Sequence, residues 1–334
     1  MNILVVGCGD LGTQHANAWA MRSDAKVVAV CDPDADRAKR LAEVHAAKPY
    51  ADWREAVAHE GLFAVSVCTP AYLHAPISIA CAELQRNVLC EKAMALKLNE
   101  ADAMIKAFEA NGVRLVISHQ LRGVGRFVAI KRLIDECVLG SPLFIRFTDV
   151  REVRPKLAMH RRSMNGGPIH DMAGHFFDLA RWFTGAEAET VAASGHVFGP
   201  GKPRLASIDE EDLGVDAAEI LVRYSGGHTL SVNINWGMPE SMPGLSAQDV
   251  VCGPKGLVRF DHSQTQLILH DSDGEREISI PENPVGPTVR IKDLVQAARN
   301  NSRPEVDGHA GRSALNLILR TLESVRTQKT VEVV

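Results

Sequence analysis

The sequence predicts an N-terminal α/β Rossmann domain, in which helices cover a doubly wound parallel sheet, and a C-terminal α+β domain built on a large, mostly antiparallel open sheet. Three observations support this fold class. Short apolar runs alternate with helical segments up to about residue 120, and a glycine-rich turn directly follows the first run. Beyond about residue 140 the runs become longer and alternate in polarity. We therefore expect two domains, residues 1–121 and 122–334.

Composition and charge exclude several classes of partner. The formal net charge of -4 leaves no basic excess for binding the phosphates of nucleic acid. No apolar run approaches the ~20 residues that span a bilayer, and the first run meets glycine before it reaches the length of a signal peptide. The seven cysteines show neither CxxC pairs nor a metal-ligand spacing. We expect a cytoplasmic protein that binds a small molecule, with no metal, nucleic acid or membrane partner.

The candidate strands of the first domain are short and continuously apolar, as suits strands buried on both faces of a parallel sheet. They lie at Ile3–Val6, Val27–Cys31, Val65–Cys68, Val88–Cys90 and Val113–Ser118. Helices are predicted between them. Pro76 suits a first helical turn, and Asn99 begins a helix that Gly112 ends.

The candidate strands of the second domain are longer and are separated by turn signals such as Ser225–Gly227 and Asp273–Gly274. They lie at Pro142–Val153, Glu189–Val197, Ala217–Tyr224, His228–Trp236, Gly256–Phe260 and Gln266–His270. Helices are predicted at Arg126–Cys137, Pro168–Phe183, Thr288–Asn300 and Arg312–Arg326.

The turn after the first strand reads Gly7-Cys8-Gly9-Asp10-Leu11-Gly12, a GxGxxG pattern at the start of a helix. In such a turn the first glycine permits the bend, the second lets the backbone approach a pyrophosphate, and the third lets the helix pack on the strand. The free N–H groups at the helix N-terminus then face the phosphates. The pattern predicts a dinucleotide site.

Asp32 supports the same site independently. It follows the second strand, 20 residues beyond Gly12, where an acid that binds the ribose hydroxyls is expected. A carboxylate there would repel a 2′-phosphate, which favours NAD over NADP. Arg37 and Arg40 are near enough to keep NADP as an alternative. Helix capping by the segment Asp32–Asp34 is the competing interpretation, and it leaves the glycine turn unexplained.

Polar residues also follow two other predicted strands, at Thr69-Pro70 and at Glu91-Lys92. In open α/β sheets, ligands bind at the carboxyl ends of the strands. A lysine in that crevice can hydrogen-bond a substrate hydroxyl and stabilise a developing alkoxide, so Lys92 is a candidate for this role. A solvated strand end is the alternative for the same pair.

In the second domain Gly166-Gly167 precedes a helix that begins at Pro168 and places Asp171 and His175 four residues apart on one face. A histidine can accept a hydroxyl proton near neutral pH, and a neighbouring carboxylate can orient it. A structural Asp/His pair is the alternative. Gly174 lowers helix propensity by about 1 kcal/mol, which indicates close approach to the backbone at that point. His170 is expected at the surface or behind the site, and Asp178 in packing.

The chain resembles the glucose-fructose oxidoreductase, inositol dehydrogenase and rhizopine catabolism (Gfo/Idh/MocA) family over nearly its whole length. The matching stretches are VVGCGDLGTQHANAW, VCDPDADRA, VSVCTPAYLHAPISIACAE, NVLCEKAMA, NGGPIHDMAGHFFDLARWFTG and the terminal TQKTVEVV, in the family's order. The resemblance implies a catalytic set of Lys92, Asp171 and His175. It also implies cofactor contacts at Thr69, Pro70, His74, Glu91, Lys92 and Gln120, with Gln120 and Arg122 close to the nicotinamide or substrate. Ala93 departs from the family's proline and leaves the backbone after Lys92 less constrained.

These observations predict an NAD-dependent dehydrogenase acting on a CH–OH group of a cyclic polyol, sugar or sugar derivative. The alternatives are a keto-sugar or imine reductase on the same fold and a ligand-sensing regulator. The basic loop Arg151–Arg162, with Arg161 and Arg162 as candidate substrate contacts beside Arg122, would suit an anionic substrate, or else a surface or subunit contact. Whether Lys92 or His175 finally accepts the proton stays open. In this family the antiparallel sheet forms subunit interfaces, so we expect a homodimer or homotetramer.

Overall fold

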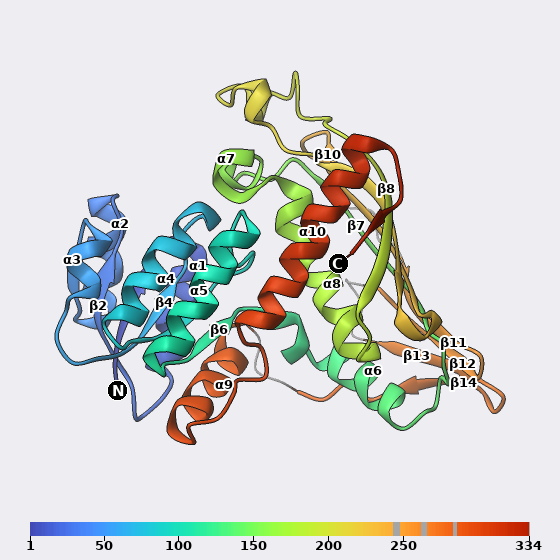
Figure 1. Ribbon diagram of the computed structural model, residues 1–334, viewed down its shortest axis with the longest axis horizontal. Coiled ribbons are helices and arrows are strands. Elements are labelled where there is room, and N and C mark those ends of the chain that lie inside the picture. Colours follow the sequence, from blue (N-terminus) through green and yellow to red (C-terminus); the bar gives the residue numbers. More distant parts are fainter. Residues whose placement is uncertain (243–247, 262–265, 283–285, 334) are drawn as a thin grey trace. The chain divides into compact units, whose positions relative to one another are not determined.

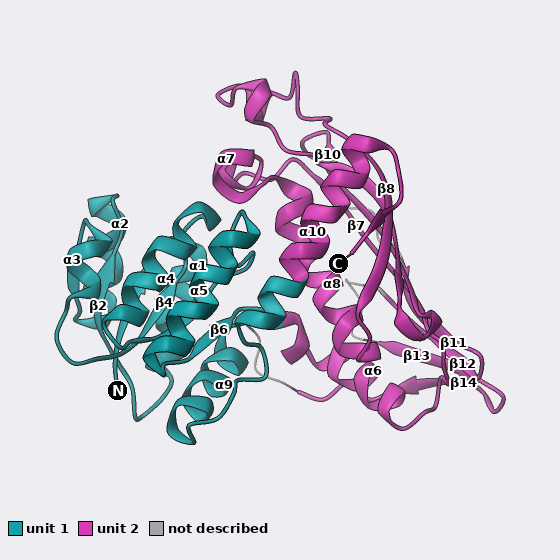
Figure 2. Cartoon of the chain, viewed as in Figure 1, with its two compact units in different colours: residues 1–120, 284–313 teal, residues 121–283, 314–334 magenta. Residues whose placement is uncertain are grey.

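The structure is a computed structural model that describes residues 1–242, 248–261, 266–282 and 286–333 (Figure 1). The chain forms two compact units (Figure 2). Unit 1 comprises residues 1–120 and 284–313, and unit 2 comprises residues 121–283 and 314–334. The predicted boundary after residue 121 therefore needs a correction, because residues 284–313 return to the first unit.

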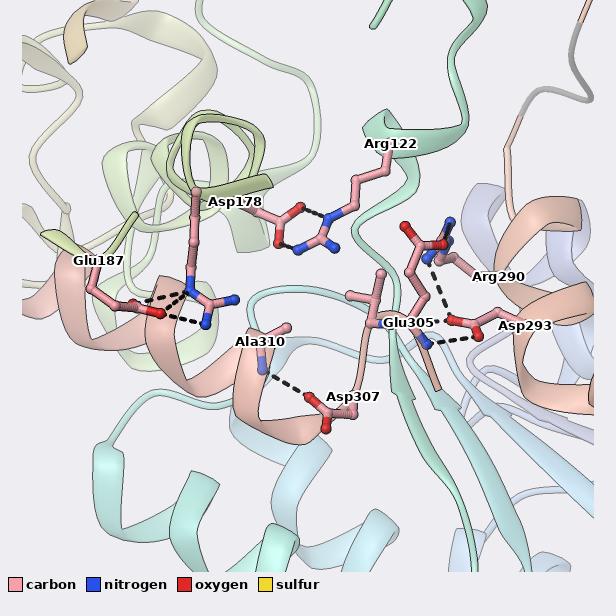
Figure 3. A network of polar contacts seen from close by, with 10 residues as sticks. Arg122, Asp178, Glu187, Arg290, Asp293, Glu305, Asp307 and Ala310 are labelled. Carbon is pink, nitrogen blue, oxygen red and sulfur yellow. Dashed lines mark hydrogen bonds and ion pairs between the residues drawn. The ribbon is translucent and has the colours of Figure 1, made fainter. Parts of the chain in front are cut away.

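Packing and charge explain this return. Helix α9 (Thr288–Arg299) contributes Ile291 and Leu294 to the same hydrophobic core as Ile3 of the first strand. Within unit 1 the fully buried Arg290 of α9 also pairs with Asp293 at 3.4 Å and with Glu305 at 3.2 Å (Figure 3). A helix that fills the core of one sheet is part of that domain, whatever its place in the sequence.

The sheet of unit 1 is parallel throughout, in the order β3-β2-β1-β4-β5-β6, which confirms the predicted Rossmann fold. Its strands are β1 Asn2–Val6, β2 Lys26–Cys31, β3 Lys48–Tyr50, β4 Leu62–Val67, β5 Asn87–Cys90 and β6 Leu115–Ile117. Its further helices are α1 Asp10–Ala20, α2 Ala35–His45, α3 Trp53–Val57, α4 His74–Glu83 and α5 Leu98–Asn111. The strand β3 has no counterpart among the predicted strands, because it is three residues long and contains Pro49.

The direction of chain progression reverses between the neighbouring strands β1 and β4. Ligands of doubly wound sheets bind outside the carboxyl ends of the strands at this point. The glycine turn follows β1 and the Thr69-Pro70 loop follows β4, so both loops lie at this edge of the sheet. The fully buried Trp19 of α1 donates to the Ser66 hydroxyl on β4 at 2.9 Å, which fixes the first helix over the switch point.

The sheet of unit 2 has the order β14-β13-β12-β11-β7-β10-β9-β8-β15, and every pairing is antiparallel except β7 with β10. Its strands are β7 Phe144–Glu152, β8 Ala188–His196, β9 Ala217–Tyr224, β10 Thr229–Met238, β11 Gln248–Gly253, β12 Gly256–Asp261, β13 Leu267–Asp271, β14 Gly274–Ile278 and β15 Val331–Glu332. The mostly antiparallel sheet is as predicted. The strands β11, β14 and β15 were not, and β14, which reads GEREI, lacks any apolar alternation.

Helices cover one face of this sheet. They are α6 Gly125–Asp135, α7 Arg162–Asn165, α8 Pro168–Thr184 and the unit 2 part of α10 Gly308–Thr327. On the covered face the ring of Phe176 from α8 stacks on Phe147 of β7 with centroids 4.8 Å apart. On the other face Phe144 and Leu221 are 59% and 47% exposed. In the described part of the chain, we find no helix long and apolar enough to cross a membrane.

Candidate active site

The glycine turn has the geometry that a dinucleotide cradle requires. Gly7 has a φ of +92°, and a Cβ at this position would lie 2.5 Å from the Cys68 carbonyl oxygen. A Cβ at Gly12 would lie 1.7 Å from the Gly7 carbonyl oxygen. At Gly9, the N-cap of α1, a Cβ would meet nothing within 4 Å. The first and third glycines are therefore needed by the fold, whereas the second leaves open the space through which a pyrophosphate would approach.

Asp32 directly follows β2, and its carboxylate accepts a hydrogen bond from the glycine turn. The side chain is 7% exposed, and it accepts hydrogen bonds from the backbone N–H of Cys8 at 2.7 Å and of Asp34 at 2.9 Å. The cap of α2 is Asp34, which accepts from the N–H groups of Asp36 and Arg37, both at 3.1 Å. Capping therefore accounts for Asp34 but leaves Asp32 available for a ribose, since each carboxylate oxygen has a second lone pair.

The loop after β4 contains two of the predicted cofactor contacts. Within the described residues, the buried hydroxyl of Thr69 has no hydrogen-bond partner, which leaves one polar group of the loop for a ligand. Pro70 is partly exposed and precedes a short 3₁₀ turn, Ala71–Leu73. The loop thus presents Thr69 at the edge of the sheet where the glycine turn lies.

His74, a predicted cofactor contact, is buried between two loops. Its side chain is fully buried, and its Nδ1 and Nε2 lie 2.8 Å from the carbonyl oxygens of Ala93 and Thr69 respectively. Burial lowers the pKa of His74, and the two backbone hydrogen bonds offset part of that effect. The residue therefore ties the loop after β4 to the segment after β5, and its contact with a cofactor stays a prediction.

Glu91, another predicted cofactor contact, is also buried. It is 3% exposed, and its Oε1 lies 2.9 Å from Nε2 of His15 on α1. Burial raises the pKa of the Glu91 carboxyl, but the hydrogen bond and charge of His15 outweigh it, so the pKa lies below its usual value. Lys92, the next residue, is partly exposed at the carboxyl end of β5. The peptide bond between Lys92 and Ala93 is cis.

The start of α8 is fixed by the two glycines before it. Gly167 caps the helix with a φ of +93°, and a Cβ there would lie 2.6 Å from the Cα of Gly214. The backbone N–H of Gly214 donates to the His160 carbonyl at 2.9 Å, and that of Ile169 donates to Val215 at 3.2 Å. Only a glycine fits this close crossing of two chain segments. The crossing sets where the first turn of α8 presents its side chains.

Asp171 and His175 lie one turn apart on α8 and are 5% and 7% exposed. A buried acid and imidazole on one helix face can take up and pass on a proton. The close approach predicted at Gly174 occurs, because a Cβ there would lie 3.0 Å from Cδ1 of Ile318, but the neighbour is α10, not a ligand. His170 was expected either at the surface or behind the site. It is 2% exposed, so it does not lie at the surface.

Arg122 is bound by Asp178, which lies three residues beyond His175 on α8. Its Nε and Nη2 contact the two carboxylate oxygens at 2.8 and 2.5 Å, and the two side chains are 6% and 2% exposed (Figure 3). The expected packing role of Asp178 is thus an ion pair. This bidentate pair occupies Nε and Nη2 of Arg122, and so it limits the predicted contact of the guanidinium with nicotinamide or substrate.

Three predicted site residues remain: Gln120, Arg161 and Arg162. Gln120 is partly exposed and begins the 3₁₀ turn Gln120–Gly123. Arg161 contacts the Asp212 carboxylate at 3.8 Å and the Ser207 carbonyl at 3.4 Å, which binds the loop before α8 to its neighbour. Arg162 is exposed at the start of the short helix α7.

Arg154 and His160 were predicted only as part of the basic loop Arg151–Arg162, and Trp236 was not predicted as a site residue. The Trp236 indole donates to Asp149 at 2.6 Å, and the guanidinium carbons of Arg151 and Arg154 lie 5.7 and 5.6 Å from its ring centroid. The parallel pairing of β7 with β10 brings these residues together across more than 80 positions. No local pattern reports such a pairing.

Among the described residues, no group of three or more histidine, cysteine, aspartate or glutamate side chains is arranged to hold a metal ion. The residues at the edge of unit 1 instead fit a dinucleotide. They offer a glycine cradle, an acid at the end of β2 and an unsatisfied threonine hydroxyl.

Comparison with known proteins agrees with this geometry. Residues 1–119 match the family described as "Oxidoreductase family, NAD-binding Rossmann fold", and residues 127–259 match the "GFO/IDH/MocA C-terminal domain". A myo-inositol 2-dehydrogenase of Thermotoga maritima is 30% identical over the whole of both chains. A D-apiose dehydrogenase of Paraburkholderia graminis is 26% identical, over 98% of this chain and 88% of that protein.

A solved structure of a probable dehydrogenase from Thermotoga maritima superposes with a TM-score of 0.79. It is 27% identical and covers 100% of this chain and 99% of its own. Because the family matches both halves of the sequence and a relative matches its full length, the chain belongs to the Gfo/Idh/MocA family of NAD-binding oxidoreductases.

Proposed function

We propose that the protein oxidises a secondary hydroxyl of a cyclic polyol, sugar or sugar derivative, with NAD as the oxidant. The observation that carries the proposal is the pair Asp171 and His175, an acid and an imidazole buried one turn apart on α8. The dehydrogenase names of the inositol and apiose relatives support the same reaction and substrate class.

The residues of unit 1 would hold NAD. Gly7, Gly9 and Gly12 would form the cradle for the pyrophosphate, Asp32 would accept hydrogen bonds from the ribose hydroxyls, and the unsatisfied hydroxyl of Thr69 would be available to the cofactor. Asp32 favours NAD over NADP because a 2′-phosphate would meet its carboxylate. When bound, NAD accepts a hydride from the carbon that bears the reacting hydroxyl.

The chain's own residues handle the proton and the developing charge. His175 takes the proton of the hydroxyl, and Asp171 orients the imidazole and stabilises its charged form. The Lys92 ammonium stabilises the oxygen as it becomes negative. Both Lys92 and His175 are candidates for the final proton acceptor, and a pH profile of each variant separates them.

The test is turnover on a panel of inositols, aldoses and sugar acids, followed through NADH absorbance. We expect His175→Ala and Lys92→Ala each to lower kcat by about 10²-fold or more with NAD binding retained. His309→Ala is the matched control, because His309 is half exposed and pairs only with Glu109 at 3.1 Å. Full turnover by both active-site variants would refute the assignment. Reaction only with NADH and a keto-sugar would instead favour the reductase alternative.

We infer that the uncovered face of the unit 2 sheet joins two copies of the chain. A shallow hollow on this face is lined by Phe144, Leu221, Val250 and Cys252 among others, and an exposed apolar sheet face of this kind needs a cover. Leu221→Glu should convert the dimer or tetramer to a monomer in light scattering. Met21→Glu, at an 80% exposed position of unit 1, should leave the assembly intact.

We also infer a cytoplasmic location from the cysteines. All seven are free thiols in the structure, and burial raises the pKa of Cys8 and of Cys31 to about 12, so neither is set up for exchange. Fractionation of cells that express the chain checks this inference.

A further inference from the structure

We propose that Arg154 binds a carboxylate on the substrate, so that the enzyme acts on a sugar acid in preference to a neutral polyol. This inference rests on the proposed function and names its substrate class. It concerns a residue of unit 2 that follows β7 and has no part in the mechanism described above.

The Arg154 guanidinium is held in place by an aromatic ring. Its central carbon lies 5.6 Å from the centroid of Trp236, whose indole N–H is fixed by Asp149 at 2.6 Å. Trp236 is 2% exposed and stands on the helix-covered face of the sheet. A cation that rests on a buried, hydrogen-bonded ring is restricted in orientation before any ligand arrives.

Arg154 nevertheless lacks an anion. Within the described residues its side chain makes no ion pair or hydrogen bond, and its Nε is buried without an acceptor. A partly buried guanidinium without a counter-charge is unfavourable, and an incoming carboxylate would relieve this.

The neighbouring acids are already engaged. Asp149 contacts Nε of Arg151 at 2.5 Å as well as the Trp236 indole. Glu152 and Glu240 lie 3.7 and 3.5 Å from the Arg204 guanidinium. Within the described residues, Arg154 is therefore the member of this cluster that has no ion-pair partner, whereas the five other charged groups, Asp149, Arg151, Glu152, Arg204 and Glu240, are paired.

The position of Arg154 relates it to the proton-handling helix of the same unit. Its carbonyl oxygen lies 3.2 Å from Nε2 of the buried His160. Burial lowers the pKa of His160, while the negative charge of Asp171 raises it and the charge of Arg154 lowers it. His160 thus lies within electrostatic range of both Arg154 and Asp171, so an anion on Arg154 would sit near the start of α8.

The chemistry of the cluster favours a carboxylate over a phosphate. A single planar guanidinium matches the two oxygens of one carboxylate. A dianionic phosphate would need a second cation, and the two other arginines of this cluster, Arg151 and Arg204, are neutralised by their own acids. The geometry therefore points to a monoanionic, planar group.

The experiment compares matched substrates with and without the acid. We expect wild-type kcat/KM to be about 100-fold higher for a hexuronate than for the corresponding aldose or for myo-inositol. Arg154→Gln should remove this preference, mainly through KM, and leave the neutral substrates within about threefold. Arg154→Lys should recover only part of the preference, because an ammonium lacks the fork. The charge-matched control is Arg326→Gln, an exposed position on α10.

Several outcomes would overturn the inference. One is equal wild-type turnover of the acid and the neutral sugar, another is an equal loss on both in Arg154→Gln, and a third is a preference for the hexose phosphate. A thermal-shift series with hexuronate separates this inference from the proposed function. If no substrate yields NADH but hexuronate raises Tm in the wild type and not in Arg154→Gln, the proposed function fails and the carboxylate site stands. Absence of a Tm difference between the two proteins refutes the site.

Discussion

His74 and Ala93 are joined by a hydrogen bond of 2.8 Å between the buried imidazole Nδ1 and the backbone carbonyl oxygen. Ala93 directly follows Lys92, and the other ring nitrogen faces the carbonyl of Thr69 at 2.8 Å. One side chain thus connects the loop after β4 with the end of β5. The His74 side chain therefore supports both the proposed cofactor loop and the backbone beside the proposed catalytic residue Lys92.

We expect His74→Ala to lower the free energy of unfolding by about 1–3 kcal/mol, because it leaves a buried carbonyl group without the N–H donor of the neutral imidazole and opens a cavity. It should also lower kcat, since the backbone that carries Lys92 loses its restraint. His74→Asn keeps one donor and should recover part of both quantities. Urea denaturation and steady-state kinetics measure them. If kcat were unchanged in the alanine variant, His74 would support only stability.

The pH dependence of stability should follow the buried histidines. Burial lowers the pKa of His74 and of His160 below the ordinary 6.5. Between the unfolded pKa of 6.5 and the lower folded values, the unfolded chain binds protons that the folded chain does not. Stability is therefore full above about pH 6.5 and falls as the pH drops through this window. Urea titrations at pH 7.5, 6.5 and 5.5 check the sign, and His74→Asn should flatten the slope. A rise in stability towards pH 5.5 would contradict this account.

The glycine turn offers a matched pair of variants. Gly9→Ala places a Cβ in open space at an ordinary φ of -75°, so the unfolding free energy should fall by no more than about 1 kcal/mol while NAD binding weakens about tenfold or more. Gly12→Ala places a Cβ 1.7 Å from the Gly7 carbonyl oxygen and should cost about 3 kcal/mol or more. Calorimetry with NAD and thermal unfolding measure the two effects. Unchanged NAD affinity in Gly9→Ala would place the pyrophosphate elsewhere.

Two ion pairs made by residues of α8, Asp178 with Arg122 and Arg181 with Glu187, differ in burial and should differ in their contribution to stability (Figure 3). Asp178→Ala leaves the buried Arg122 charge without its partner and should cost about 3–5 kcal/mol. Glu187→Ala breaks an exposed pair with Arg181, whose side chains are 62% and 37% exposed, and should cost less than about 1 kcal/mol. Denaturant unfolding at one ionic strength compares them. Equal losses would mean that the Arg122 pair is not desolvated as the structure has it.

Sequence patterns predicted the parts of the fold that are local. The apolar runs of β1, β2, β4 and β5 and the glycine turn are continuous in the chain, and so is the Asp171–His175 spacing. The short strand β3 contains Pro49, and β14 has no apolar alternation, so both lacked a periodic signal. Both segments form strands because they pair with neighbouring strands, β3 with β2 and β14 with β13. The residues of a segment alone do not indicate such pairing.

Long-range contacts decided most of the remaining differences. The structure buries His74 and Glu91 against partners elsewhere in the chain that no local pattern indicates, and the cofactor contacts that the resemblance implied for them stay predictions. Arg122 meets Asp178 across 56 positions, and Arg154 meets Trp236 through the pairing of β7 with β10. Gly174 also shows that the sequence predicts a local property but not the long-range contact. Its close approach could be predicted from one residue, but the identity of the neighbour, Ile318, could not.

The most direct test of the account follows the hydrogen that leaves the substrate. A polyol or sugar acid that supports NADH formation is prepared with deuterium on the carbon to be oxidised, and the reduced cofactor is weighed by mass spectrometry. The account predicts NADH heavier by one mass unit, a slower rate than with the undeuterated substrate, and loss of the reaction in His175→Ala. Product formation without deuterium in the cofactor would show that the hydrogen does not pass to NAD, and would contradict the central claim.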